Sequence, residues 1–229
     1  MTTRATRPCI GPAILLAVTM SGAIAGEPIF APVKIDGPVH DPANASWWFG
    51  PFNESASVLD MDGDGDLDIS CGKNWYEAPD WKKHENYFEG ADNLPHVWDH
   101  CLEYALDVNK DGRTDVVNTG YDPGGIVWYE NPGKPNVKWK THKVYDSKVM
   151  EGAYPLGDID GDGDMDLLGD NFSPRPNDGV TWFESIDEAP WLERHFIGTQ
   201  GGTHGAGLGD INGDGRPDIV LPAGWYEAP

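Results

Sequence analysis

One nine-residue loop pattern occurs four times in this chain and limits the possible folds more than any other feature. The pattern is Asp-x-Asp/Asn-x-Asp-Gly-x-x-Asp, and successive loops start 47, 51 and 52 residues apart. A regular period near 50 residues is typical of repeat proteins, in which each repeat is one supersecondary unit that packs on its neighbours. The sequence therefore predicts four similar units in order along the chain. The loops are Asp60 to Asp68, Asp107 to Asp115, Asp158 to Asp166 and Asp210 to Asp218.

Each loop offers the oxygen ligands that a hard divalent cation prefers. Side-chain oxygens at loop positions one, three, five and nine and a backbone carbonyl at position seven would form a cage of the size that Ca²⁺ takes. Glycine stands at position six of every loop and supplies the backbone freedom for a sharp turn. These glycines are Gly65, Gly112, Gly163 and Gly215.

The alternative is that each loop is an ordinary Asp-Gly turn without a metal. Four loops in register favour the metal, and we expect about four Ca²⁺ sites. Of the 38 acids in the chain, 16 lie in these loops, where they repel one another unless cations share the space. The predicted ligands are the side chains of Asp60, Asp62, Asp64, Asp68, Asp107, Asn109, Asp111, Asp115, Asp158, Asp160, Asp162, Asp166, Asp210, Asn212, Asp214 and Asp218 and the carbonyls of Asp66, Arg113, Asp164 and Arg216.

Short strands are expected around each loop. An apolar or β-branched strand begins at the last Asp of the loop, as in Asp115-Val116-Val117, and an aromatic strand follows after a turn. Three repeats then close with a strand that carries Trp and His, so each unit has four strands when the strand before the loop is counted. The aromatic strands are Trp75-Tyr76-Glu77, Trp128-Tyr129-Glu130, Trp182-Phe183-Glu184 and Trp225-Tyr226-Glu227, and the closing strands surround Trp81 and His84, Trp139 and His142, and Trp191 and His195.

Four short antiparallel strands repeated radially describe the blade of a β-propeller. No window of ten or more residues has helical periodicity, so we predict an all-β fold, a β-propeller of four-stranded antiparallel blades with four repeats. The segment 32–36 could complete the fourth blade and close a four-bladed ring. We favour the alternative, a fragment of a larger propeller, because the last repeat stops after its aromatic strand without a capping tail.

The recurring aromatic residues are interpreted as packing between blades, since each large ring buries 150–250 Å² or so. A sugar-stacking platform is the less favoured reading. The three histidines recur at one position of the blade and are interpreted as structural.

The first 25 residues have the pattern of a secretory signal peptide. Arg4 and Arg7 precede an apolar run, and small residues end at Ala25, where cleavage is expected. The apolar run is too short to span a bilayer. The sequence thus predicts a signal peptide over residues 1–25 and a mature chain over 26–229 that is secreted, periplasmic or at the cell surface.

The charge of the chain excludes two classes of partner. Removing the two arginines changes the formal net charge from -22 to -24, so nucleic acid and anionic membranes are poor candidates. Two cysteines, Cys71 and Cys101, remain in a compartment where a disulfide can persist. A bridge between them and two separate thiols both stay open, because sequence does not supply the distance that a disulfide requires.

With four Asp loops in register with four Trp-aromatic-Glu strands, the chain resembles the FG-GAP or VCBS repeat family of extracellular calcium-binding propellers. The resemblance implies that each loop holds Ca²⁺ at one rim of the propeller and that binding uses the opposite face. The run Thr203-His204-Gly205-Ala206-Gly207-Leu208-Gly209-Asp210 with Gly224-Trp225-Tyr226-Glu227-Ala228-Pro229 is also similar, more weakly, to the propeller part of aldos-2-ulose dehydratase-like proteins.

A less repetitive set of polar residues precedes the loops, where the inner strand would begin at the opposite face. Convergent His, Asp and Glu there could bind a transition metal or act as acid and base, and they could equally line a wet channel. No Ser-His-Asp, phosphate-loop or Cys-x-x-Cys signature is present. The candidates are Glu54, Asp99, His100, Glu151 and His204.

Two functions follow. The first, favoured because no catalytic motif is recognisable, is a binding module that presents loops 118–125 and 169–179 to an extracellular protein or carbohydrate. The second is a fragment of a metal-dependent sugar dehydratase-like or lyase-like propeller enzyme.

Overall fold

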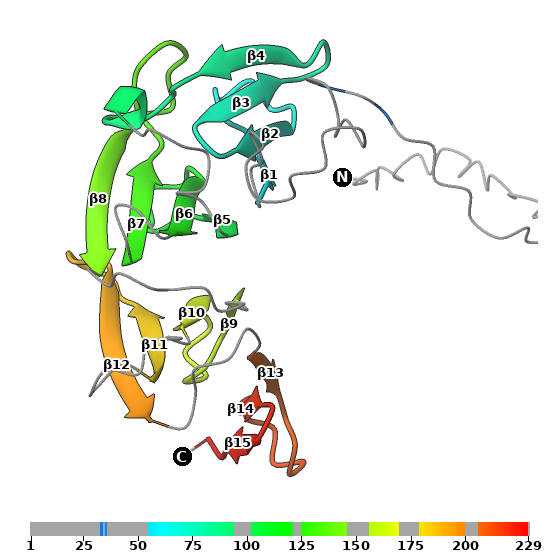
Figure 1. Ribbon diagram of the computed structural model, residues 1–229, viewed down its shortest axis with the longest axis vertical. Helices are drawn as coiled ribbons and strands as arrows, with labels where there is room; N and C mark the ends of the chain where they lie inside the picture. Colours follow the sequence, from blue (N-terminus) through cyan, green and yellow to red (C-terminus); the bar gives the residue numbers. More distant parts are fainter. Residues whose placement is uncertain are drawn as a thin grey trace, which may run out of the picture. The chain divides into compact units, whose positions relative to one another are not determined.

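Figure 1 shows the computed structural model of the chain. The structure describes residues 33, 35, 55–93, 102–120, 125–145, 156–169, 179–199 and 206–228. The chain divides into two units, Met1–Lys34 and Ile35–Pro229, and the strands below belong to the second. The predicted signal peptide, the predicted closing segment 32–36 apart from residues 33 and 35, and Cys101 lie outside the described residues, so these predictions stay untested.

The described residues form β-strands and one turn of 3₁₀ helix, η2, so the predicted all-β class is confirmed. The strands are β1 Ser57–Leu59, β2 Asp68–Cys71, β3 Asn74–Glu77, β4 Lys82–Glu85, β5 Leu102–Leu106, β6 Asp115–Gly120, β7 Gly125–Glu130, β8 Lys140–Tyr145, β9 Leu156–Gly157, β10 Asp166–Gly169, β11 Val180–Ser185, β12 Leu192–Gly198, β13 Gly207–Gly209, β14 Asp218–Leu221 and β15 Gly224–Tyr226, and η2 spans Ala91–Asn93.

The strands pair in four separate antiparallel sheets, coloured cyan, green, yellow to orange, and red in Figure 1. Three sheets have four strands, β1 to β4, β5 to β8 and β9 to β12, and the last has three, β13 to β15. In every sheet the strands lie side by side in chain order. The pairings between the described strands stay within each sheet and show no closed ring, so the propeller remains a prediction.

The Asp loops connect the first and second strands of each sheet. Each second strand begins at the last Asp of its loop: Asp68, Asp115, Asp166 and Asp218. The second strands are short and mostly buried, and the third strands carry the aromatic residues. In the second sheet, Val116 pairs with Tyr129 and Val117 with Trp128. The predicted strand order within a repeat is thus confirmed.

Each sheet packs against the next through a hydrophobic cluster. The first cluster joins Trp75 of β3 to Val116 and Tyr129 of the second sheet. A second cluster joins the second and third sheets, with Trp128, Leu167 and Phe183 at its centre. The third joins Leu168 and Val180 to Ile219 of the last sheet. The predicted role of the aromatic strands in packing between units is confirmed by these clusters, whereas Trp225 in β15 is 42% exposed.

The first sheet is followed by a segment that reaches the second sheet. It runs from Asn86 through η2 and forms backbone hydrogen bonds with Trp139, the residue before β8. The N–H of Glu89 donates to the carbonyl of Trp139 at 2.8 Å, and the N–H of Trp139 donates to the carbonyl of Tyr87 at 2.8 Å. Phe88 and Trp139 form a parallel bridge. This segment therefore joins the first and second sheets at their outer strands.

Candidate metal-binding loops

The first carboxylate of each loop shapes the turn by accepting backbone hydrogen bonds. In the first loop, Oδ1 of Asp60 accepts from the N–H of Gly63 at 2.7 Å, and Oδ2 accepts from the N–H of Gly65 at 3.0 Å. Gly65 has a φ of 95°, a conformation that favours glycine. The same arrangement of Asp158 with Gly161 and Gly163 occurs in the third loop. The predicted glycine turn is thus present.

The last carboxylate of each loop, at position nine, is buried and holds two separated parts of the sheet together. Oδ2 of Asp68 accepts from the N–H of Met61 at 2.9 Å, and Oδ1 accepts from the N–H of Ala78 at 2.8 Å. Ala78 directly follows the Glu that ends the aromatic strand. Asp115, Asp166 and Asp218 make the equivalent pairs of bonds to Val108 and Asn131, to Ile159 and Ser185, and to Ile211 and Ala228.

This second role was missed by the sequence reading, which assigned position nine only as a metal ligand. The spacing offered no signal, because the residue after Trp-aromatic-Glu stands 10, 16, 19 and 10 residues after the last Asp in the four loops. Carboxylate oxygens have two lone pairs each, so accepting a backbone N–H does not exclude cation binding.

Carboxylates converge in the first and third loops. One oxygen from each of Asp60, Asp62 and Asp68 lies within 4.8 Å of the others, and Asp158, Asp160 and Asp166 form the same group. Oxygen atoms in this arrangement, on loops with positive-φ glycines, fit the preference of Ca²⁺ for several oxygen ligands around one point. The side chains of the first and third loops therefore fit the predicted ion.

The second and fourth loops differ because each carries an arginine. The guanidinium of Arg113 binds Oδ2 of Asp111, and Nη2 of Arg216 lies 2.6 Å from Oδ2 of Asp214. Asn109 donates to the same oxygen of Asp111 at 3.0 Å. In these loops the carboxylate at position five already has a positive partner. The four loops are thus of two kinds, which the common pattern did not reveal.

Burial raises the pKa of several loop carboxyls. Desolvation is the largest cause in each case, and it raises the pKa of Asp115 to about 7 and that of Asp166 to about 6. It also raises the pKa of Asp68, and it raises the pKa of Asp62 together with the neighbouring Asp64. The charged forms are therefore less stable here than in water, and a divalent cation would offset that cost.

The recurring histidines form a repeated group with the Trp and Glu of the aromatic strand. His84 stacks on Trp75 with ring centroids 4.0 Å apart, and its Nε2 lies 2.6 Å from Glu77 Oε2. Hydrogen bonds from His84 and Lys82 lower the pKa of Glu77. His142 with Trp128 and Glu130, and His195 with Trp182 and Glu184, repeat the arrangement. These contacts agree with the structural role predicted for the three histidines.

Glu54, Asp99, His100, Glu151 and His204 all lie outside the described residues, as do 121–124 and 170–178 of the two predicted binding loops. The catalytic site therefore stays a prediction. Within the described residues, no helix has the length and apolar character needed to cross a membrane.

The second and third Asp loops and the strands between them lie in residues 107–169, and these residues match the family of FG-GAP-like repeats. The chain carries an FG-GAP-like repeat. The family resemblance expected from the motifs is thereby confirmed, and the first and fourth units repeat the same loop and strand pattern outside the matched FG-GAP-like region.

Among solved structures, the V. cholerae biofilm matrix protein Bap1 is similar to this chain, with a TM-score of 0.48 and 19% sequence identity. The similarity covers 76% of this chain and 28% of Bap1, so the chain spans only about 28% of that structure's length. No curated protein sequence matches the chain at a significant level.

Proposed function

We propose that this chain is an exported, calcium-stabilised repeat module that binds an extracellular protein or carbohydrate. In this proposal residues 1–25 are a signal peptide that is removed, and residues 26–229 form blades of a β-propeller. The observation that carries the proposal is the convergence of three carboxylates in each of the first and third loops.

The loop geometry supports calcium as a structural ion. Each loop joins two strands of one sheet, and its last Asp also accepts a hydrogen bond from the residue that follows Trp-aromatic-Glu. A cation held by the first and last carboxylates would therefore fix the three inner strands relative to one another. It would also reduce the repulsion between acids in a chain of net charge -22.

The sheet arrangement supports the propeller. Consecutive antiparallel sheets of up to four strands, each packed on the next through its aromatic strand, are what blades require. A binding module is favoured over an enzyme because the sequence carries no recognisable catalytic motif.

Calcium titration of the metal-free chain tests the proposal. The chain is treated with a chelator, dialysed, and titrated with Ca²⁺ by calorimetry, with Mg²⁺ as the control ion because Mg²⁺ prefers a tighter octahedral site. We expect heat on adding Ca²⁺ and a higher melting temperature, since an ion at about 100 times its Kd contributes about 2.7 kcal/mol per site. An unchanged melting temperature and no heat with Ca²⁺ would overturn the proposal.

A further inference from the structure

The last sheet ends in an aromatic strand that no other described strand covers. In the first three sheets the aromatic strand pairs with a fourth strand, which is β4, β8 or β12. In the last sheet the aromatic strand is β15, and within the described residues it pairs only with β14. A strand at the edge of a sheet can add a further strand through its backbone N–H and C=O groups. The outer edge of β15 is therefore a place where a fourth strand can dock.

A repeated side-chain group shows how such a fourth strand docks in the other three sheets. The strand places a histidine on the tryptophan of the aromatic strand and beside the glutamate that stands two residues later. The centroids of the two stacked rings are 4.0, 4.1 and 4.5 Å apart in the three repeats. The histidine Nε2 lies 2.6, 2.7 and 2.6 Å from the glutamate Oε2. Backbone pairing, one stacked ring and one carboxylate contact thus hold each fourth strand.

The last sheet has the tryptophan and the glutamate of this group, but among the described residues it has no histidine. The three histidines that the structure describes belong to the other three groups. Trp225 is 42% exposed, whereas Trp75 and Trp128 are 6% and 2% exposed. Glu227 is also exposed, and its Oε1 accepts a hydrogen bond from Nδ2 of Asn212 at 3.0 Å. A strand added beside β15 would therefore meet both an exposed indole ring and a carboxylate.

The outer strands also differ in charge. Charged side chains, above all lysine, commonly protect the edge strands of soluble proteins from further pairing. Each of the three fourth strands carries at least two charged residues, whereas the three residues of β15 are uncharged. These charged residues are Lys82, Lys83 and Glu85 in β4, Lys140 and Lys143 in β8, and Glu193 and Arg194 in β12. The edge of β15 lacks this protection, as is expected of an edge that another strand covers.

The segment 32–36, which was predicted to complete the last sheet, does not supply the side chain that is missing. Its sequence, Pro-Val-Lys-Ile-Asp, contains no histidine. Val33 within it is 76% exposed and belongs to no strand. The Trp-His-Glu group of the last sheet therefore needs a histidine from another source.

We propose that the outer edge of β15 binds an extended segment of a partner protein that carries a histidine and a basic residue. The segment pairs antiparallel with β15 as a fourth strand and stacks its histidine on Trp225 beside Glu227. Addition of a strand to a sheet edge is a recurring mode of peptide recognition, in which the backbone provides affinity and the side chains provide specificity.

Charge favours a basic segment. The chain has a formal net charge of -22, and in the first two sheets a lysine stands opposite the glutamate of the aromatic strand, as Lys82 does opposite Glu77. Complementary charge increases both the rate and the specificity of association. This inference rests on the proposed function and deepens it by naming the class of partner and its site.

Titration of the full Ca²⁺-loaded chain with a strand peptide tests the site. The probe is a hexapeptide with blocked ends and the sequence of β8, Lys-Thr-His-Lys-Val-Tyr, because β8 places His142 opposite Trp128. The peptide is added to about 5 mM, which fills most of a site of millimolar Kd, and binding is followed by the NMR amide signals of β15. We expect these signals to shift. The same peptide with alanine in place of histidine should bind about threefold to tenfold more weakly, because the ring contact is lost.

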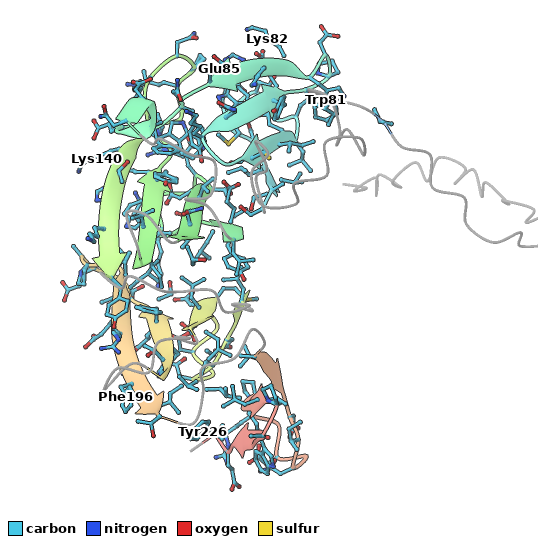
Figure 2. All side chains as sticks on the ribbon, in the orientation of Figure 1. Trp81, Lys82, Glu85, Lys140, Phe196 and Tyr226 are labelled. Atoms are coloured by element: carbon cyan, nitrogen blue, oxygen red, sulfur yellow. The ribbon has the colours of Figure 1, made fainter. Side chains whose placement is uncertain are left out.

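Two variants with matched controls locate the binding. Trp225→Ala removes the stacking surface, and its control is Phe196→Ala, which removes a ring of similar exposure, 46% against 42%, from the outer strand β12 (Figure 2). Glu227→Gln removes the carboxylate, and its control is Glu188→Gln, at another exposed glutamate, between β11 and β12. We expect Trp225→Ala to weaken binding about threefold to tenfold and Glu227→Gln about twofold to fivefold. Neither control should change it.

The result that supports the site is binding that weakens in Trp225→Ala, in Glu227→Gln and with the alanine peptide but not in the controls. Absence of peptide binding overturns the proposal, as does equal binding by the wild type and both β15 variants. If Trp225→Ala fails to fold, Glu227→Gln against Glu188→Gln still decides, because both glutamates are exposed. The calcium titration is read separately: stabilisation by Ca²⁺ without peptide binding refutes only this site, whereas peptide binding without any calcium effect refutes only the calcium proposal.

Discussion

At the scale of single residues, the aspartates of one loop have different roles although they look alike in the sequence. Asp68 is buried and accepts two backbone hydrogen bonds from separate parts of its sheet. Asp62 is half-buried and accepts a local backbone hydrogen bond from the N–H of Asp64 at 3.3 Å. The first is therefore needed by the fold with or without an ion, whereas the second would mainly serve the proposed ion.

Comparing Asp68→Asn with Asp62→Asn separates these roles. In Asp68→Asn one carboxylate oxygen becomes an N–H₂ that faces a backbone donor, so we expect a loss of about 1–3 kcal/mol of unfolding free energy even in chelator. Asp62→Asn keeps its local bond and removes one charge, so it should leave the metal-free stability unchanged and weaken Ca²⁺ binding. Urea unfolding with chelator and with Ca²⁺ measures both. Equal destabilisation of the two variants in chelator would contradict this assignment.

The raised pKa of the buried Asp115 predicts how the stability of the metal-free protein depends on pH. Its pKa in the folded chain is raised from 3.8 to about 7, so the folded state binds the proton more tightly than the unfolded state does. The stability contribution of this carboxyl is then greatest at acid pH and falls as the pH rises from about 4 to about 7. Urea unfolding in chelator at several pH values, with Asp115→Asn as the non-titrating reference, should show the wild-type advantage shrinking with pH. An advantage that grows with pH would contradict the prediction.

At the scale of elements, a lysine joins neighbouring sheets from an unusual backbone position. Lys110 stands at loop position four with a φ of 57°, where the other loops have Gly63, Gly161 and Gly213. Its Nζ lies 2.5 Å from Oδ2 of Asp164 and 2.6 Å from Oδ1 of Asp187, both in the third repeat. The ion pairs explain why a side chain is kept where glycine would be less strained.

Two substitutions of Lys110 measure the strain and the ion pairs. Lys110→Ala removes the ion pairs and keeps a side chain in the left-handed region, whereas Lys110→Gly removes both the pairs and the strain. We expect Lys110→Gly to be more stable than Lys110→Ala by about 1 kcal/mol. Exposed ion pairs contribute about 0–1 kcal/mol, so Lys110→Gly should lie close to the wild type in thermal unfolding. A glycine variant less stable than the alanine variant would refute strain at this position.

At the scale of the whole molecule, the two kinds of loop predict two classes of calcium site. The first and third loops each place three carboxylates together, whereas the second and fourth loops have Asn at position three and an arginine on the carboxylate at position five. More carboxylates and no competing cation give higher calcium affinity. Sites of the first kind alternate along the chain with sites of the second.

Calorimetric titration of the metal-free chain should therefore show two tighter and two weaker sites. The double variant Asp62→Asn with Asp160→Asn should lose the tighter phase and keep the weaker one. Replacing Arg113 and Arg216 with Gln should strengthen the weaker phase, because the competing guanidinium is removed. Four equal sites, or a tighter phase that survives the double Asp variant, would contradict the alternation.

The repeat, the four loops, the strand order and the aromatic packing were predictable from the sequence because all of them depend on local patterns with a regular period. Alternation and turn residues act over a few residues, and the regular period repeats this local pattern four times along the chain. This is why β2, which begins at Asp68, starts where the motif ends.

Only the tertiary structure revealed the two backbone hydrogen bonds that the buried Asp68 accepts and the ion pairs of Lys110 with the third repeat. The two ion-pair partners of Lys110 are far from it in the chain, by 54 and 77 residues. No local pattern specifies which distant side chains meet, because that depends on how each sheet packs on the next. The sequence by itself therefore determines the chemistry of the loops, whereas the packing of the sheets determines which distant residues come into contact.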